Sequence, residues 1–226
     1  MDIQKNFHDA EQQLAKSQFG EFPRRFDFLG RDFILHKSVF SPEFFLGSKI
    51  YTPNLPLKPG DSLLDMGCGC GVIGITACLE HNLQKVVCAD ICLPAIENTI
   101  KNIALHNLTD RVQAIQSDVF ENISKTEKFD LCFWNAPYFD YDKENMTELD
   151  MRVYDPGYEN IRRFIIGATE RLNPDGKIML GFSSSRFPLQ HMEQKVAEIG
   201  FEVKVFFREC DNFGFKQELL EITKKI

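Results

Sequence analysis

Strand-like and helix-like segments alternate along the chain from Asp61 onward. Short apolar runs, such as residues 62–67 and 85–90, are each followed by a segment of helix length. Because a parallel return between strands needs a dozen or more residues, this alternation predicts a parallel sheet covered by helices on both faces. The last two strand-like runs are separated only by a short turn at residues 212–214, which forces an antiparallel pair. We therefore predict an α/β fold with a doubly wound, mostly parallel sheet of seven strands and an antiparallel last strand.

The first 50 residues have a different pattern. Residues 2–18 have the composition of a helix, and the stretch RRFDFLGRDFIL alternates apolar and polar residues on both sides of Gly30. That alternation is typical of a β-hairpin with a glycine in its turn. We expect an N-terminal extension over residues 1–50, built from a helix and a hairpin, followed by one large domain over residues 51–226.

The net charge and the placement of cysteines and histidines argue against several function classes. The formal net charge is -7 and the pI is about 5.3, so the chain has no general basic field for a phosphate backbone. The seven cysteines show no CxxC spacing and the five histidines are scattered, which predicts reduced thiols and no metal site. No apolar run approaches the roughly 18 residues of a membrane span. We expect a cytoplasmic protein that binds neither membrane nor metal.

A glycine-rich loop follows the first apolar run of the large domain. The sequence LLDMGCGCGVIGI places Gly67, Gly69 and Gly71 between a strand and a helix, where glycine lets the backbone approach a ligand. Residues 69–74 also satisfy GxGxxG, so a dinucleotide site is an alternative, as is a tight turn without a ligand. The carboxylate of Asp65 favours a ligand with cationic groups over a pyrophosphate.

The spacing D-x-G-x-G-x-G resembles the first motif of class I S-adenosylmethionine-dependent methyltransferases, which have a Rossmann-like fold. The resemblance implies that the loop surrounds the methionine part of S-adenosyl-L-methionine, with Asp65 near its ammonium group. It also implies that Asp90 bonds the ribose hydroxyls and that Asp118 and Val119 meet the adenine. Taken alone, Asp90 could be a helix N-cap and Asp118 an Asx turn. The resemblance assigns cofactor binding to Asp65, Gly67, Cys68, Gly69, Gly71, Asp90, Ile91, Asp118, Val119 and Asn135.

The stretch FWNAPYF ends the fourth strand of the large domain with a polar amide followed closely by a proline. Since ligands lie at the carboxyl ends of strands in doubly wound sheets, Asn135 should face the same crevice as the aspartates. NAPY resembles the N-P-P-Y motif of methyltransferases that modify planar nitrogens, with Ala136 in place of the first proline. The resemblance predicts four catalytic residues: Asn135, Ala136, Pro137 and Tyr138.

The chemistry of methyl transfer to a planar nitrogen explains the residue types of this motif. The lone pair of an amide or aryl amine is delocalised, so two acceptors must hold its N–H bonds to one side. The Asn135 side chain and the main-chain carbonyl of residue 136, which alanine retains, would be these acceptors, and Tyr138 would stack on the substrate plane. The alternative is that Asn135 only forms a turn before Pro137. Strand alternation points Trp134 away from the side of Asn135, which favours core packing for the indole.

The hairpin and the order of later elements resemble the HemK-type glutamine methyltransferases and the "small" methyltransferase-domain enzymes of rRNA and tRNA. Only about 20 residues precede the hairpin, fewer than in the helical N-terminal domain of HemK enzymes. The loop over residues 139–157 is rich in acids and predicts a lid that repels phosphates and favours a protein or cationic substrate, and the alternative is a solvated mobile loop. Basic and aromatic residues around the hairpin, including Arg24, Arg31, Phe28 and Phe33, are a weaker sign of nucleic-acid binding.

These observations predict an S-adenosylmethionine-dependent N-methyltransferase whose acceptor is a protein glutamine in preference to a nucleic acid. The alternatives are an RNA or DNA base amine, a small metabolite, an NAD-dependent oxidoreductase, and a cofactor-binding module without activity.

Overall fold

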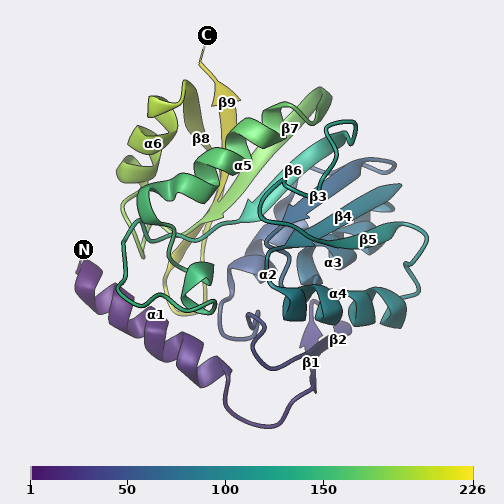
Figure 1. Cartoon of the computed structure of the whole chain (residues 1–226), viewed down its shortest axis with the longest axis horizontal. Helices are drawn as coiled ribbons and strands as arrows, with labels where there is room; N and C mark the ends of the chain where they lie inside the picture. The colour runs from purple at the N-terminus through teal and green to yellow at the C-terminus, as the bar shows by residue number, and fades with distance from the viewer. Residues whose placement is uncertain (1, 226) are drawn as a thin grey trace.

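The computed structural model describes residues 2–225, and its centre is a twisted sheet of seven strands in that range (Figure 1). The strands are β3 (Ser62–Met66), β4 (Lys85–Asp90), β5 (Val112–Gln116), β6 (Phe129–Asn135), β7 (Leu172–Phe182), β8 (Phe201–Cys210) and β9 (Lys216–Lys224). Their order in the sheet is β5-β4-β3-β6-β7-β9-β8. The last strand, β9, is inserted between β7 and β8 and is antiparallel to both. The predicted fold class is therefore confirmed.

Helices cover both faces of this sheet, as the alternating sequence predicts. They are α1 (Ile3–Ser17), α2 (Gly47–Tyr51), α3 (Val72–His81), α4 (Leu93–Leu105), α5 (Glu159–Thr169) and α6 (Leu189–Glu198). Three single 3₁₀ turns join them: η1 (Thr52–Asn54), η2 (Asp150–Arg152) and η3 (Pro156–Tyr158). Among residues 2–225, no helix combines the length and the apolarity that crossing a membrane would require.

Two hydrophobic clusters show which helices cover which face. Neighbouring residues of a strand point to opposite faces, and Leu63 and Leu64 of β3 accordingly belong to different clusters. The cluster around Leu63 contains apolar residues of α3, α4 and the hairpin, whereas the cluster around Leu64 contains those of α1, α5 and α6. The sheet is therefore buried on both sides, and its free edge for ligands is the carboxyl end of the parallel strands.

The predicted hairpin is present as β1 (Arg24–Phe28) and β2 (Arg31–Leu35), with Gly30 in the turn. It docks on α4 through two buried amides. Asn102 accepts a hydrogen bond from the Ile34 backbone N–H at 2.8 Å and donates to the carbonyls of Ile34 and Cys70. Asn98 accepts from the His36 N–H at 2.8 Å. These bonds attach the extension to the glycine loop.

Candidate active site

The loop between β3 and α3 forms one wall of a cavity. Gly67 and Gly69 line it and have φ angles of +61° and +58°, a left-handed conformation that glycine adopts without steric cost. A Cβ atom at Gly67 would lie 2.4 Å from Nε1 of Trp134. The indole therefore fills the space that any side chain at position 67 would need.

Three residues that were predicted to bind the cofactor lie behind this wall: Asp65, Cys68 and Gly71. Alternation along β3 points Asp65 to the face covered by α3, where it is 1% exposed and accepts a hydrogen bond from the Gly74 N–H at 2.9 Å. The Cys68 thiol lies 3.6 Å from the Thr99 hydroxyl, and a Cβ at Gly71 would also face Thr99. The structure does not bring these side chains into the cavity, so their contact with a cofactor stays a prediction.

The surroundings of Asp65 shift the pKa of its carboxyl group. Burial raises the pKa of its carboxyl to about 7, the nearby charge of Asp90 adds to this rise, and the hydrogen bond from Gly74 opposes it. The carboxyl is therefore only partly ionised at neutral pH.

Asp90 lies at the end of β4, where it lines the cavity. One carboxylate oxygen accepts the Gly69 N–H at 2.9 Å and the other accepts the Cys92 N–H at the same distance. Burial raises the pKa of Asp90, and these two hydrogen bonds oppose that rise. The N-cap of α4 is Cys92 and not Asp90, so the alternative interpretation of Asp90 as a helix cap is wrong. The carboxylate instead clamps the glycine loop onto the end of β4.

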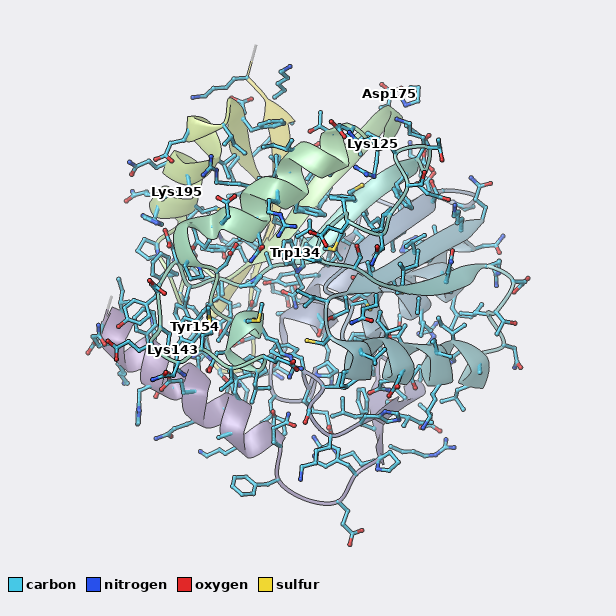
Figure 2. The ribbon with its side chains drawn as sticks, viewed as in Figure 1. Lys125, Trp134, Lys143, Tyr154, Asp175 and Lys195 are labelled. Carbon is cyan, nitrogen blue, oxygen red and sulfur yellow. The ribbon has the colours of Figure 1, made fainter. Side chains whose placement is uncertain are left out.

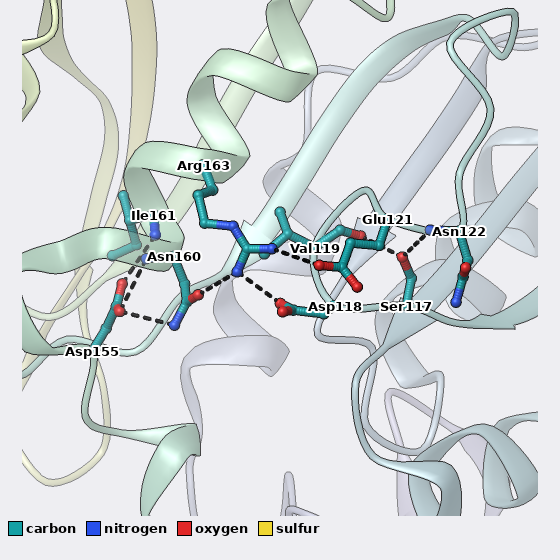
Figure 3. Close-up of polar contacts among 9 residues, drawn as sticks. All are labelled: Ser117, Asp118, Val119, Glu121, Asn122, Asp155, Asn160, Ile161 and Arg163. Atoms are coloured by element: carbon teal, nitrogen blue, oxygen red, sulfur yellow. Dashed lines mark hydrogen bonds and ion pairs between the residues drawn. The ribbon is translucent and has the colours of Figure 1, made fainter.

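Asp118 lies on the far side of the cavity and is held by a chain of polar contacts (Figure 3). Arg163 of α5 donates to Asp118 Oδ1 at 2.9 Å and to Asn160 Oδ1 at 3.0 Å. Asn160 in turn donates to Asp155 through its backbone N–H and its side-chain amide, each at 3.1 Å. This network fixes one oxygen of Asp118 and leaves its second oxygen available to a ligand.

The strand-end motif shares the cavity with these residues. Asn135 is the last residue of β6, and within residues 2–225 its side-chain amide has no hydrogen-bond partner. Ala136 is buried, Tyr138 is half-buried with its hydroxyl inside the protein, and burial raises the pKa of that hydroxyl to about 12. Of the predicted site residues, the cavity is lined by Gly67, Gly69, Asp90, Ile91, Asp118, Val119, Asn135, Ala136, Pro137 and Tyr138.

Trp134 packs in the core, as predicted, and also lines the cavity. Its ring packs edge-on against Phe164 of α5, with centroids 5.4 Å apart, as core packing predicts. The same indole also lies over Gly67 and lines the cavity near the centre of the molecule (Figure 2). Alternation along β6 directs the Trp134 side chain away from that of Asn135. Because Gly67 has no side chain, the edge of the indole still reaches the cavity.

Three acids of the loop after Tyr138 are held by specific contacts. Asp155 accepts backbone N–H groups at the start of α5, and Asp140 contacts His191 at 2.6 Å. Asp150 pairs with Lys143, which also pairs with Glu11 of α1. Figure 2 shows Lys143 and Tyr154 beside α1. These contacts fix three acids of the loop, whereas Glu148 is exposed at the cavity. A lid that repels phosphates stays a prediction.

The sequence also suggested that aromatic residues of the hairpin bind nucleic acid, and for two of them this is wrong. Phe28 and Phe33 are fully buried and cannot stack on bases. Arg24 and Arg31 pair with Glu43 and Glu80, so the hairpin presents no stacking platform.

Several residues of the cavity carried no signal in the sequence. Asn160 lines the cavity, and Arg163, which reaches it only through its hydrogen bond to Asp118, lies on the same surface helix, α5, where a charged or amide residue is ordinary. Arg186 and Gln13 come from a loop and from the extension. Phe213, at the tip of the β8–β9 turn, is 72% exposed and reaches the cavity mouth. Only the tertiary arrangement brings these side chains to the site.

The sequence model of the methyltransferase small domain family matches residues 30–201. A bifunctional methyltransferase of Rickettsia typhi is 30% identical over 190 residues, which are 70% of this chain and 36% of that protein. A release factor glutamine methyltransferase of Clostridium botulinum is 33% identical over 58% of this chain and 47% of its own. A ribosomal protein uL3 glutamine methyltransferase of Francisella tularensis is 29% identical over 73% of this chain and 56% of its own. The chain thus spans only part of these relatives.

Solved structures share the fold. A methyltransferase from Pyrococcus furiosus superposes with a TM-score of 0.65 at 18% identity, covering 98% of this chain and 99% of that one. The tRNA m1G37 methyltransferase of M. jannaschii gives a TM-score of 0.60 at 22% identity, covering 92% and 59% of the two chains.

Proposed function

The chain belongs to the methyltransferase small domain family, and from this premise we propose that it transfers a methyl group from S-adenosylmethionine to a planar nitrogen, that of a protein glutamine amide. One observation carries the proposal. The unpartnered amide of Asn135 opens into the same cavity as Gly67, Asp90 and Asp118. This shared space supports a role for Asn135 toward the acceptor and for the other three residues toward the cofactor.

The residues on the cofactor side fit an adenosine carrying an amino acid. The Asp90 carboxylate accepts from Gly69 of the glycine loop with one oxygen and from Cys92 with the other, and each oxygen keeps a lone pair for a ribose hydroxyl. Asp118 keeps one oxygen for the adenine amino group, and Gly67 and Gly69 leave the loop without side chains toward the cavity. When bound, the cofactor supplies a methyl group activated by a sulfonium.

On the acceptor side, the chain's own groups orient the nitrogen. The Asn135 side-chain oxygen and the Ala136 carbonyl accept the two N–H bonds of the substrate amide, which turns its lone pair toward the methyl group. Ala136 is 3% exposed, so the turn is fixed by packing where the N-P-P-Y motif uses a second proline. Positioning and the exclusion of water supply the remaining rate enhancement.

A protein acceptor is supported by two observations. Two of the relatives are named as glutamine methyltransferases. In addition, the net charge of -7 opposes a polyanionic acceptor. We further propose that residues 1–50 act as a substrate-side extension to the catalytic domain over residues 51–226, because Gln13, Phe40 and Phe44 line the cavity.

The cofactor is tested by thermal denaturation. S-adenosylhomocysteine should stabilise the chain by about 2.7 kcal/mol at a hundred times its Kd, and NAD should not. Stabilisation by NAD alone would refute the proposal and restore the dinucleotide interpretation of residues 69–74.

The acceptor is tested with labelled cofactor in cell extract, followed by protease or nuclease digestion. Loss of the label to protease is expected, and its loss to nuclease would indicate a base amine. Asn135→Ala should reduce methylation of that acceptor by at least about a hundredfold. Gln113→Ala removes an exposed amide of β5 and should change nothing. An unchanged rate with Asn135→Ala would refute the assigned mechanism.

A further inference from the structure

Arg186 is a buried cation that lines the same cavity as Asn135. It follows β7, lines the cavity and is 8% exposed. Its Nη2 donates to the side-chain oxygen of Gln13 at 3.0 Å, and its guanidinium lies 3.9 Å from the centroid of the Phe215 ring. Within residues 2–225, no carboxylate lies within ion-pair distance of Arg186, and its Nη1 has no hydrogen-bond partner.

A second buried arginine shows how the fold satisfies such a group when it is structural. Arg171 is 4% exposed. Its three guanidinium nitrogens donate to the carbonyls of Ser124, Gly167 and Ile123 at 3.1, 2.9 and 2.9 Å. Because a buried charge is costly unless it is paired or fully hydrogen-bonded, the incomplete shell of Arg186 points to a missing partner.

Tyr138 supplies a second open donor in the same cavity. Its hydroxyl is buried and has no hydrogen-bond partner among the described residues. The positive charge of Arg186 lowers the pKa of this phenol, but burial outweighs it and raises the pKa to about 12. The hydroxyl therefore stays protonated and can donate. Tyr138 and Asn135, which is proposed to orient the reacting nitrogen, line the same cavity.

We propose that Arg186 and Tyr138 form a subsite for a carboxylate carried by the methyl acceptor, close to the amide that is methylated. This inference rests on the proposed function and specifies its substrate as a glutamine with a neighbouring acidic group. A carboxylate fits better than a phosphate because the Arg186 guanidinium carries one positive charge and Asp211 and Glu148 also line the cavity. The other arginine of the cavity, Arg152, acts on the charge of Asp90. A doubly charged phosphate would be repelled more strongly by Asp211 and Glu148.

The subsite is tested by the fluorescence of Trp134, which is the only tryptophan in the chain and lines the cavity. The protein is saturated with S-adenosylhomocysteine and titrated with N-acetyl-Gln-Glu, with N-acetyl-Gln-Gln, or with adenosine monophosphate. The acidic dipeptide should bind about tenfold more tightly than the neutral one, as a charged hydrogen bond predicts. Arg186→Met keeps the packing on Phe215 and should abolish the difference, whereas Arg186→Lys should keep part of it. Arg25→Gln, at an exposed site of the hairpin, should change nothing.

Equal binding of the two dipeptides would overturn the inference. So would a preference for the acidic dipeptide that survives in Arg186→Met, or no saturation by the acidic dipeptide at about 10 mM. Tighter binding of adenosine monophosphate that depends on Arg186 would assign a phosphate instead. Saturation with S-adenosylhomocysteine precedes each titration, so failure of cofactor binding, which would refute the proposed function, is seen separately.

Discussion

Asp65→Asn should flatten the dependence of stability on pH. The folded chain holds the proton on Asp65 more tightly than the unfolded chain does, because burial raises the pKa from 3.8 to about 7. The free energy of unfolding must therefore fall as pH rises from about 4 to about 7, and the loss is complete above 7. At 1.36 kcal/mol for each pH unit, this group destabilises the folded state by roughly 4 kcal/mol above pH 7. The asparagine oxygen can still accept the Gly74 N–H.

The assay is urea denaturation of both proteins at several pH values between 4 and 8. The quantity compared is the difference in free energy of unfolding between the wild type and Asp65→Asn, since other titrating groups cancel in that difference. It should change in favour of the variant by up to about 4 kcal/mol between pH 4 and pH 8. Asp110→Asn, at an exposed carboxylate, is the matched control. A difference that is constant over this pH range would refute the argument.

The same variant tests the contact predicted from the sequence. If Asp65 neighbours the ammonium of the cofactor, the affinity for S-adenosylhomocysteine should rise through pH 7 in the wild type and not in Asp65→Asn. If Asp65 only holds Gly74, both proteins should show the same profile.

Three further variants test the glycine loop and the support of Asp118. Gly67→Ala and Gly69→Ala share a backbone strain of about 1–2 kcal/mol, but only the former places a Cβ 2.4 Å from the Trp134 ring. Gly67→Ala should therefore lose more stability in urea and shift the tryptophan emission, and equal losses with unshifted emission would contradict this. Arg163→Met should weaken binding of S-adenosylhomocysteine about three- to tenfold through Asp118. It should leave unchanged the binding of an analogue that lacks the adenine amino group, and an equal loss for both ligands would show that Arg163 acts elsewhere.

The fold could be predicted because its evidence is local. Helix-length segments between strands require parallel pairing, and the short turn before β9 requires an antiparallel pair. The strand-end positions of Asp90 and Asn135 follow from the same rule, since parallel strands share one carboxyl edge. These residues accordingly line one cavity. The family prediction is likewise confirmed by the match over residues 30–201.

The side chains that complete the site could not be predicted because their partners are distant in sequence. The number of acids in the loop predicts a lid that repels phosphates, but it does not predict the contacts of these acids. Backbone N–H groups of α5 donate to Asp155, and Lys143 pairs with Asp150. Charge counting cannot register such contacts. Arg186 meets Gln13 across 173 positions, so no window of sequence relates them.

The space around Asn135 also depends on a residue that has no side chain. Gly181 of β7 pairs with Asn135 across the sheet. A Cβ there would lie 3.1 Å from the Asn135 side-chain oxygen and 2.5 Å from the ring of Tyr51. Tyr51 is fixed in turn, because its hydroxyl donates to the Phe182 carbonyl at 2.8 Å. Any larger residue at position 181 must therefore displace the asparagine, since the tyrosine cannot move without losing a buried hydrogen bond. The orientation of the Asn135 amide is thus set by the neighbouring strand as well as by its own motif, and in the proposed mechanism this support holds the amide where alanine replaces the first proline of N-P-P-Y.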